Sequence, residues 1–283
     1  NLLIASTLIM LLIVVPVIFM SCWFAWKYRE SNTDAPYDPE WDHSAKVELY
    51  VWAAPLLIII ALGAMTWVHT HLLDPYRPLD NISEGQSAEG LETLRIHAVA
   101  LEWKWLFIYP DLGIATVNEV AAPVDMPIKF EITSPNLMNS LFIPSLAGMV
   151  YAMPGMETNI HAVINETGTY DGVSGNYSGE GYSDMRFKFK GLDEADFQAW
   201  IAEAKAEGVP LDSPNYEKLA EHSIKEPVRR YAAVENGLYQ RILNLCVDDS
   251  DMCLNDMMAI DDQIAGGQIC YAWPSDKPKS IFD

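Results

Sequence analysis

Residues 170–185 read YDGVSGNYSGEGYSDM, a stretch with four glycines between two strand-like runs, residues 161–165 and 186–190. Polar or sulfur-bearing side chains recur in it at intervals of four, four and three residues, namely Ser174, Ser178, Tyr182 and Met185. A glycine-rich stretch between strands is typical of a loop. The spacing therefore predicts a loop that folds around something small, and the alternative is an ordinary surface turn.

Short runs with a two-residue hydrophobic period surround this loop. They predict strands over residues 94–98, 101–109, 114–120, 128–133, 159–164 and 185–189. Proline and glycine turns separate the runs. We therefore predict a compact antiparallel sandwich or barrel over residues 93–190.

The run 101–110, LEWKWLFIYP, carries aromatic side chains at alternate positions, namely Trp103, Trp105, Phe107 and Tyr109. Alternate residues of a strand point to the same face of a sheet. The run is therefore interpreted as one aromatic core face.

The composition changes after Lys190. Apolar residues at helical spacing, with acidic residues in the first turn, predict a helix over residues 193–208. Shorter helices are predicted over residues 215–221 and 235–246, so residues 191–247 form a helical appendix. The tail, residues 248–283, is acidic and weakly patterned, and we expect it to be a mobile extension.

Three of the four cysteines, Cys246, Cys253 and Cys270, lie near the C-terminus, and Cys22 lies in the apolar N-terminal run. In an oxidising compartment Cys246 and Cys253 can form a disulfide, but three cysteines allow several pairings. The sequence does not choose between these pairings.

Two apolar runs near the N-terminus predict a transmembrane hairpin, residues 1–68. Residues 2–26 carry no charge and would rise about 37 Å as a helix, more than a bilayer core of roughly 30 Å. Residues 47–68 form a second apolar run. The first run ends in Trp23, Phe24, Trp26 and Lys27, an aromatic belt and basic anchor that argues against a cleaved signal peptide.

The basic residues near these runs predict the orientation of the hairpin. Lys27, Arg29 and Lys46 lie in or beside the connecting loop, residues 27–46, which is therefore predicted to be cytoplasmic. Everything after residue 68 then lies outside, beginning with a linker over residues 69–92. An outside N-terminus also requires a translocating signal, which we expect ahead of Asn1.

The outer part of the chain is strongly acidic. After residue 67 there are 15 basic and 33 acidic residues, and the whole chain has a net charge of −21. Such a surface excludes nucleic acid as a partner. It favours a basic partner such as a basic cytochrome, or it is simply a solvated acidic surface.

Glu48 is an ionisable side chain about one turn into the second apolar run. An ionisable group at that depth indicates a functional role, most often in a proton path, and the alternative is an interfacial carboxylate. His69 and His71 follow the run with a spacing that suits a shared metal only in an extended segment. They are interpreted as interfacial anchors.

The chain resembles subunit II of bacterial ubiquinol oxidases of the cytochrome bo type, within the haem–copper oxidases. The resemblance covers roughly residues 1–232 and rests on FAWKYR (24–29), the segment 48–55, WKW (103–105), YP (109–110), GIATVNE (113–119), MNS (138–140) and GTYDG (168–172). It implies a periplasmic cupredoxin-like domain after the two transmembrane helices.

Relatives that serve cytochrome c carry a dinuclear copper centre on the matching loop, with cysteine, acidic residue, cysteine, histidine and methionine in order and one more histidine upstream. In this chain those places are held by Asn139, Ser174, Asn176, Ser178 and Tyr182, and only Met185 keeps its type. Copper shared by two bridging thiolates needs cysteine and neutral imidazole ligands. The resemblance thus implies that this chain holds no metal, no cofactor and no catalytic residue.

What the resemblance implies for function is a non-redox subunit of a proton-pumping ubiquinol oxidase in the bacterial inner membrane. Subunit I would carry two haems and one copper and would use ubiquinol to reduce oxygen to water. This chain would pack on subunit I, with subunits III and IV and membrane lipids as further partners, and Glu48 would help protons enter. The alternative is a copper-bearing electron-entry subunit of a cytochrome c oxidase, for which the run 101–110 would be the aromatic entry region.

Overall fold

The computed structural model describes residues 2–36, 38–83, 85–88, 90–206, 208–248 and 250–264. The chain divides into two compact units, Asn1–Asp74 and Pro75–Asp283. Each unit is described by itself below.

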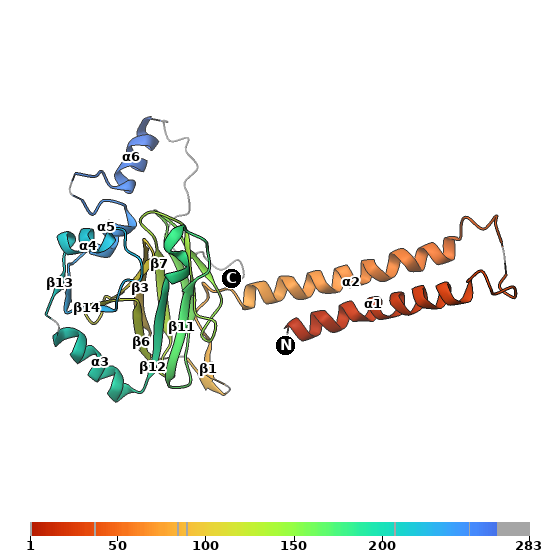
Figure 1. Ribbon diagram of the computed structural model, residues 1–283, viewed down its shortest axis with the longest axis horizontal. Helices are drawn as coiled ribbons and strands as arrows, with labels where there is room; N and C mark the ends of the chain where they lie inside the picture. Colours follow the sequence, from red (N-terminus) through yellow and green to blue (C-terminus); the bar gives the residue numbers. More distant parts are fainter. Residues whose placement is uncertain are drawn as a thin grey trace. The chain divides into compact units, whose positions relative to one another are not determined.

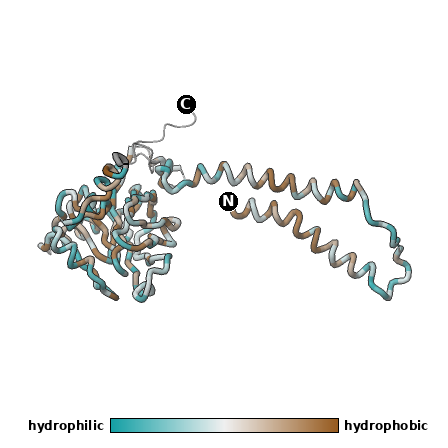
Figure 2. The backbone as a smooth tube through the Cα atoms, turned by 90° about the horizontal axis from the view of Figure 1, so that it is seen from above, coloured by the Kyte–Doolittle hydropathy of each residue, from teal (hydrophilic) through white to brown (hydrophobic). Residues whose placement is uncertain are grey.

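The first unit is a pair of helices, α1 (Leu2–Lys27) and α2 (Ala45–Leu72), which run side by side as a hairpin (Figure 1). Both are long and apolar enough to cross a membrane, and Figure 2 shows the hydrophobic residues that dominate them. Polar side chains inside the helices bond to backbone carbonyls one turn back, as Ser21 Oγ does to Val17 O at 2.8 Å. Such bonds satisfy polar groups that lipid cannot hydrate.

The second helix extends past the predicted end at residue 68. His69 and His71 therefore lie in the last turn of α2, and each ring nitrogen Nδ1 lies 2.8 Å from the carbonyl oxygen four residues earlier. Side chains that are two residues apart on a helix point in different directions and do not face each other. These histidines consequently share no site in the described structure.

The second unit contains two facing sheets. The six-stranded sheet has the order β10-β7-β3-β4-β5-β14, and the five-stranded sheet has the order β6-β12-β11-β8-β9. The first sheet consists of β3 (Leu94–Leu101), β4 (Lys104–Tyr109), β5 (Ile114–Val117), β7 (Ile128–Thr133), β10 (Thr158–Ala162) and β14 (Arg229–Tyr231). The second consists of β6 (Glu119–Pro123), β8 (Asn139–Phe142), β9 (Val150–Ala152), β11 (Gly168–Ser174) and β12 (Arg186–Leu192).

The predicted sandwich is confirmed, although it is not wholly antiparallel. The pairs β3 with β7 and β6 with β12 are parallel, and the other pairs within the two sheets are antiparallel. Before it, the linker forms a small ribbon of β1 (Asn81–Ser83) and β2 (Gln86–Ser87). The backbone N–H of His161 in β10 donates to Pro75 O at 3.2 Å, so the start of this unit bonds to the outermost strand of the first sheet.

Two strand predictions and the loop prediction were wrong in their extent. The run 101–109 is not one strand, because β3 ends at Leu101 and Glu102 and Trp103 form the turn before β4. The run 114–120 breaks at Asn118, whose backbone is left-handed with φ 55°. The predicted loop 170–185 begins as strand β11, so only residues 175–185 form the loop, with a 3-10 helix at Glu180–Asp184.

The strands β4 and β5 in the first sheet are buried on both faces, which explains why alternation was a partial guide. Trp105 and Phe107 point into the core between the sheets, whereas Leu106 and Ile108 point into a second core with Leu219. A strand buried on both faces loses the apolar and polar alternation that marks a half-exposed strand.

The C-terminal region builds this second core. It contains α3 (Glu194–Ala206), β13 (Pro210–Leu211), α4 (Ser213–Ala220), β15 (Ala233–Val234), α5 (Leu238–Leu243) and α6 (Leu254–Ile264), together with β14. The three predicted helices are confirmed, but the appendix also adds β14 to the first sheet. The view in Figure 1 places α3, α4 and α5 on one side of the sandwich.

Part of the predicted tail, residues 248–283, forms regular structure, which the weak sequence pattern did not indicate. A disulfide joins Cys246 to Cys253, and α6 follows directly after it. The bridge and the bond from Leu254 N to Asn244 O, 2.8 Å, hold the start of α6 next to the end of α5. Cys270 and the rest of the tail lie outside the described residues.

Glu119 in β6 joins the C-terminal region to the sandwich. Its carboxylate accepts a bond from Trp200 Nε1 at 2.7 Å and pairs with Arg230 at 2.8 Å and with Lys190 at 2.7 Å. Burial opposes its charge, but these three partners outweigh burial and keep the pKa of Glu119 below its usual value. A buried carboxylate with this many partners holds α3 and β14 in place.

Candidate functional site

The loop of residues 175–185 and the start of β8 bring the replaced copper-ligand positions together. Asn139 and Ser174 are buried and bonded to each other, since Ser174 Oγ lies 3.2 Å from Asn139 Oδ1. Asn139 Nδ2 donates to Leu137 O at 3.1 Å, and Asn176 Nδ2 donates to Met138 O at 2.8 Å. The side chains at these positions thus bond to the chain itself.

The remaining positions make packing and backbone contacts, and the buried hydroxyl of Ser178 has no hydrogen-bond partner in the described structure. Met185 is buried at 1% exposure, and its carbonyl accepts a bond from Ser174 N at 3.2 Å. The Tyr182 ring packs edge-on against the exposed Tyr177 ring, with centroids 5.6 Å apart. The carbonyl of Ser178 accepts a bond from Trp103 Nε1 at 3.0 Å.

These donors do not fit a copper ion. Asn139, Ser174 and Asn176 offer amide and hydroxyl groups that already bond to the protein, and Met185 offers one buried thioether. Soft copper sites require thiolate and imidazole ligands. No group of three histidine, cysteine or acidic side chains able to hold a metal occurs among the described residues.

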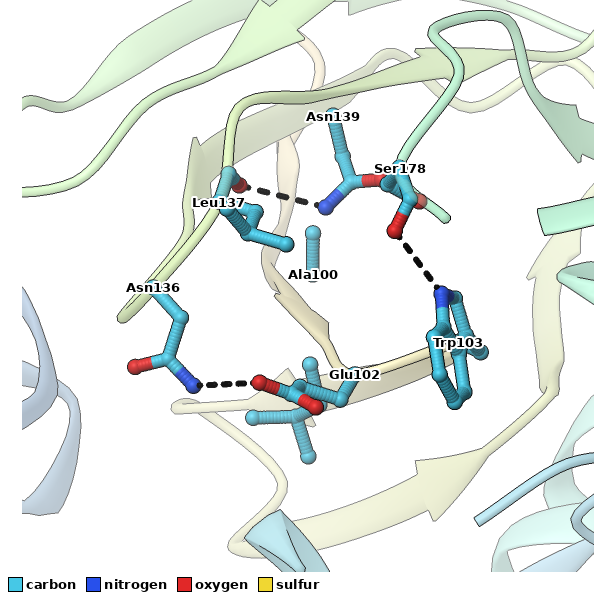
Figure 3. Close-up of a pocket in the computed structure, with 8 residues that line it drawn as sticks. Ala100, Glu102, Trp103, Asn136, Leu137, Asn139 and Ser178 are labelled. Carbon is cyan, nitrogen blue, oxygen red and sulfur yellow. Dashed lines mark hydrogen bonds between the residues drawn. The ribbon is translucent and has the colours of Figure 1, made fainter. Parts of the chain in front are cut away.

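A small pocket adjoins the loop (Figure 3). It is lined by Ala100, Leu101, Glu102, Trp103, Asn136, Leu137, Asn139 and Ser178. Asn136 Nδ2 donates to Glu102 Oε1 at 3.3 Å on one side of the pocket. Two replaced ligand positions, Asn139 and Ser178, therefore lie beside the turn that carries Trp103.

Trp103 packs against the core that contains Trp105, but it does so from a turn and is only partly buried. Its backbone is left-handed, with φ 58°, because it lies in the turn between β3 and β4. The indole is half-buried and lies beside His222, with ring centroids 5.4 Å apart. The C-terminal region thus reaches the tryptophan that the alternating pattern assigned to the core.

Lys104 is a buried ammonium that the sequence analysis did not single out. Its side chain is 1% exposed and Nζ donates to Leu219 O at 2.8 Å and Glu221 O at 2.7 Å. Burial lowers the pKa of Lys104. The sequence signal was a lysine between two tryptophans in an otherwise apolar strand. A lysine at such a position is expected to be buried, and a buried lysine must find hydrogen-bond acceptors.

A second ionic cluster lies on the outer side of β3 and β7. His97 Nε2 lies 2.8 Å from Glu131 Oε2, and Lys129 Nζ lies 2.6 Å from Glu131 Oε1. The bond to His97, aided by Lys129 and opposed by burial, lowers the pKa of Glu131 to about 2. The ring of Tyr239 in α5 stacks on His97 with centroids 3.8 Å apart.

Glu48 lies in the first turn of α2, within the first unit. Its Oε1 atom lies 2.6 Å from His43 Nδ1, and both side chains are more than half exposed. The sequence analysis missed His43, although its position in the connecting loop five residues before Glu48 was a usable signal. The proposed role of Glu48 in proton entry remains a prediction.

Comparison with known families agrees with this geometry. The model of the cytochrome c oxidase subunit II periplasmic domain matches residues 112–191, and that of the COX aromatic rich motif matches residues 205–250. The helical hairpin and the cupredoxin-like sandwich together define a second subunit of a haem–copper oxidase.

Curated relatives narrow this class. The cytochrome bo(3) ubiquinol oxidase subunit 2 of Pseudomonas putida is 48% identical over 86% of this chain and 75% of its own length. The same subunit of Pseudomonas aeruginosa is 49% identical over 86% of this chain and 71% of its own length. The ubiquinol oxidase subunit 2 of Acetobacter aceti is 47% identical over 84% of this chain and 75% of its own length. The chain belongs to the ubiquinol oxidase subunit 2 family.

Proposed function

We propose that this chain is the non-redox subunit of a ubiquinol oxidase that couples quinol oxidation to oxygen reduction and proton translocation. The observation that carries the proposal is that three of the replaced ligand positions, Asn139, Ser174 and Asn176, have side chains that bond to the protein itself. Quinol delivers electrons from within the membrane, so the oxidase does not need a copper centre that accepts electrons from a soluble donor. The two haems and one copper would then belong to subunit I.

In this proposal the hairpin packs against subunit I and the outer domain caps its periplasmic face. Subunits III and IV and membrane lipids are further partners. The apolar surfaces of α1 and α2 support this arrangement, because their side chains are largely exposed in the isolated chain and must meet lipid or protein in a bilayer. The inner membrane is the expected location, with the sandwich on the periplasmic side.

A tag on this chain allows the oxidase complex to be purified and tested for its electron donor. We expect oxygen consumption with ubiquinol and none with reduced cytochrome c, together with about one copper per complex, since no thiolate and imidazole set is available on this loop. Turnover on cytochrome c with about three coppers per complex would instead favour the copper-bearing alternative, for which the acidic surface is the supporting observation.

Glu48 is proposed to help protons enter the complex. Its carboxylate lies at the start of α2 and pairs with His43, a titratable group that can exchange protons with it. Glu48→Gln should slow ubiquinol turnover several-fold while haem content stays normal, because the variant keeps the shape but cannot carry a proton. Glu40→Gln, in the connecting loop before α2, is the control, and equal turnover in both variants would remove this role.

A further inference from the structure

The region matched by the aromatic rich motif contacts the loop 175–185 through one short segment. We name this segment, residues 221–226, the strap; it connects α4 to β14. The strap is held at both ends by the sandwich. Lys104 Nζ donates to Glu221 O at 2.7 Å, and Asn118 Nδ2 donates to Glu226 O at 2.8 Å.

The strap lies against the turn that carries Trp103. His222 Nδ1 contacts the carboxylate of Glu102, and the His222 ring lies 5.4 Å from the Trp103 ring. Lys225 Nζ reaches Asp184 in the loop at 3.8 Å. The strap therefore meets the loop directly and also through Trp103.

Trp103 also packs closely on the loop. A Cβ atom on Gly181 would lie 2.4 Å from the indole, and one on Gly179 would lie 3.3 Å from it. The bond from Trp103 Nε1 to Ser178 O, 3.0 Å, adds a polar contact. The ring thus occupies a space that exists because the loop has glycine at these positions.

The loop needs such contacts because it has little regular secondary structure. Its other contacts lie at its two ends, where Gly175 N donates to Ser140 Oγ at 2.8 Å, Asn176 Nδ2 donates to Met138 O at 2.8 Å and Met185 is buried. Residues 175–185 contain only a short 3-10 helix, Glu180–Asp184. Fixing a backbone costs roughly 1–2 kcal/mol per residue, and in metal proteins ligand bonds to the ion offset this cost. The side chains at the replaced ligand positions do not suit a copper ion, so protein contacts must supply the order.

We propose an internal clamp, in which the strap of the aromatic-rich region and Trp103 of the sandwich together hold the loop 175–185 in a single conformation. The contacts from His222 and Lys225 take the place that metal coordination has in a metal-binding loop. The clamp concerns the shape of this loop, and it does not depend on the identity of the electron donor.

Hydrogen exchange measured by mass spectrometry on the purified oxidase complex tests the clamp. His222→Ala removes the strap side chain, and Gly181→Ala pushes Trp103 away from the loop. Each should speed exchange in residues 175–185 about tenfold, because exchange from a local opening follows the stability of that segment. Exchange in β4 and β12 should stay unchanged.

Two matched controls separate the clamp from general damage. Lys218→Ala removes an exposed side chain of α4 in the same region, and Gly148→Ala adds a Cβ where nothing lies within 4 Å. Both should leave the loop protected. Unchanged loop exchange in both test variants would overturn the proposal, and so would an equal loss of protection in β4, because that would indicate general destabilisation.

Discussion

The hydroxyl of Tyr109 links the two sheets, and its removal offers a sharp test of the fold. Tyr109 in β4 is fully buried, and its Oη atom donates to Ala121 O at 2.8 Å and accepts from Ala121 N at 2.9 Å. Ala121 belongs to β6 in the facing sheet. Burial raises the pKa of Tyr109, so the hydroxyl stays protonated over the whole working pH range.

Tyr109→Phe keeps the ring, and with it the edge-on contact to Trp200 at 5.5 Å. Only the oxygen is lost, so the main cost is a buried N–H and a buried C=O of Ala121 without partners. Each such group costs roughly 1–3 kcal/mol. Because the variant also avoids burying a hydroxyl, we expect a net loss of about 2–3 kcal/mol.

Thermal unfolding of the purified complex, followed by tryptophan fluorescence, measures this loss. For a unit of this size about 2–3 kcal/mol lowers Tm by roughly 4–12 °C. Tyr170→Phe is the matched control, because the Tyr170 hydroxyl bonds to Glu166 O at 3.0 Å in an exposed position where water can replace it. The reasoning is refuted if the two variants have the same Tm.

Two further substitutions test the ionic contacts. The pKa of Glu131, about 2, is below its ordinary 4.5, so its stabilising contribution is present above pH 4.5 and is lost as pH falls towards 2. Glu131→Gln should therefore flatten the fall in Tm between pH 5 and pH 3, and a curve parallel to that of the unsubstituted chain would contradict the assignment. Lys104→Met keeps the apolar stem but leaves two carbonyls at the end of α4 without their donor. We expect about 1–2 kcal/mol of destabilisation, measured as faster proteolysis within residues 205–250. Unchanged proteolysis would show that Lys104 does not stabilise the end of α4.

Much of the fold follows from local patterns. The uncharged and apolar runs near the N-terminus correspond to α1 and α2, and the two-residue periods correspond to strands of the sandwich. Helix signals after residue 190 were also correct for α3, α4 and α5. These patterns succeed because they depend on the few residues next to one another in the chain.

The replaced ligand positions could be identified by resemblance, but their contacts could not be predicted. Ser174 and Asn139 are 35 residues apart, and their bond forms because β8 and β11 pair. The turn at Trp103 was missed for a similar reason, since a left-handed backbone in a turn leaves the alternation of aromatic residues unchanged. Long-range pairing and turn geometry decide both features.

By itself the sequence determined the two apolar helices, the sandwich and the absence of thiolate and imidazole at the loop positions 174, 178 and 182. These are properties of residue type and local order, which no tertiary contact can alter. Only the tertiary structure decided that the C-terminal region buries the second face of the β3–β4 hairpin, that Lys104 finds its acceptors in α4 and the strap, and that His222 meets Trp103. Each of these contacts joins residues more than a hundred positions apart, and their energies depend on burial that exists only once both sheets and the appendix have packed.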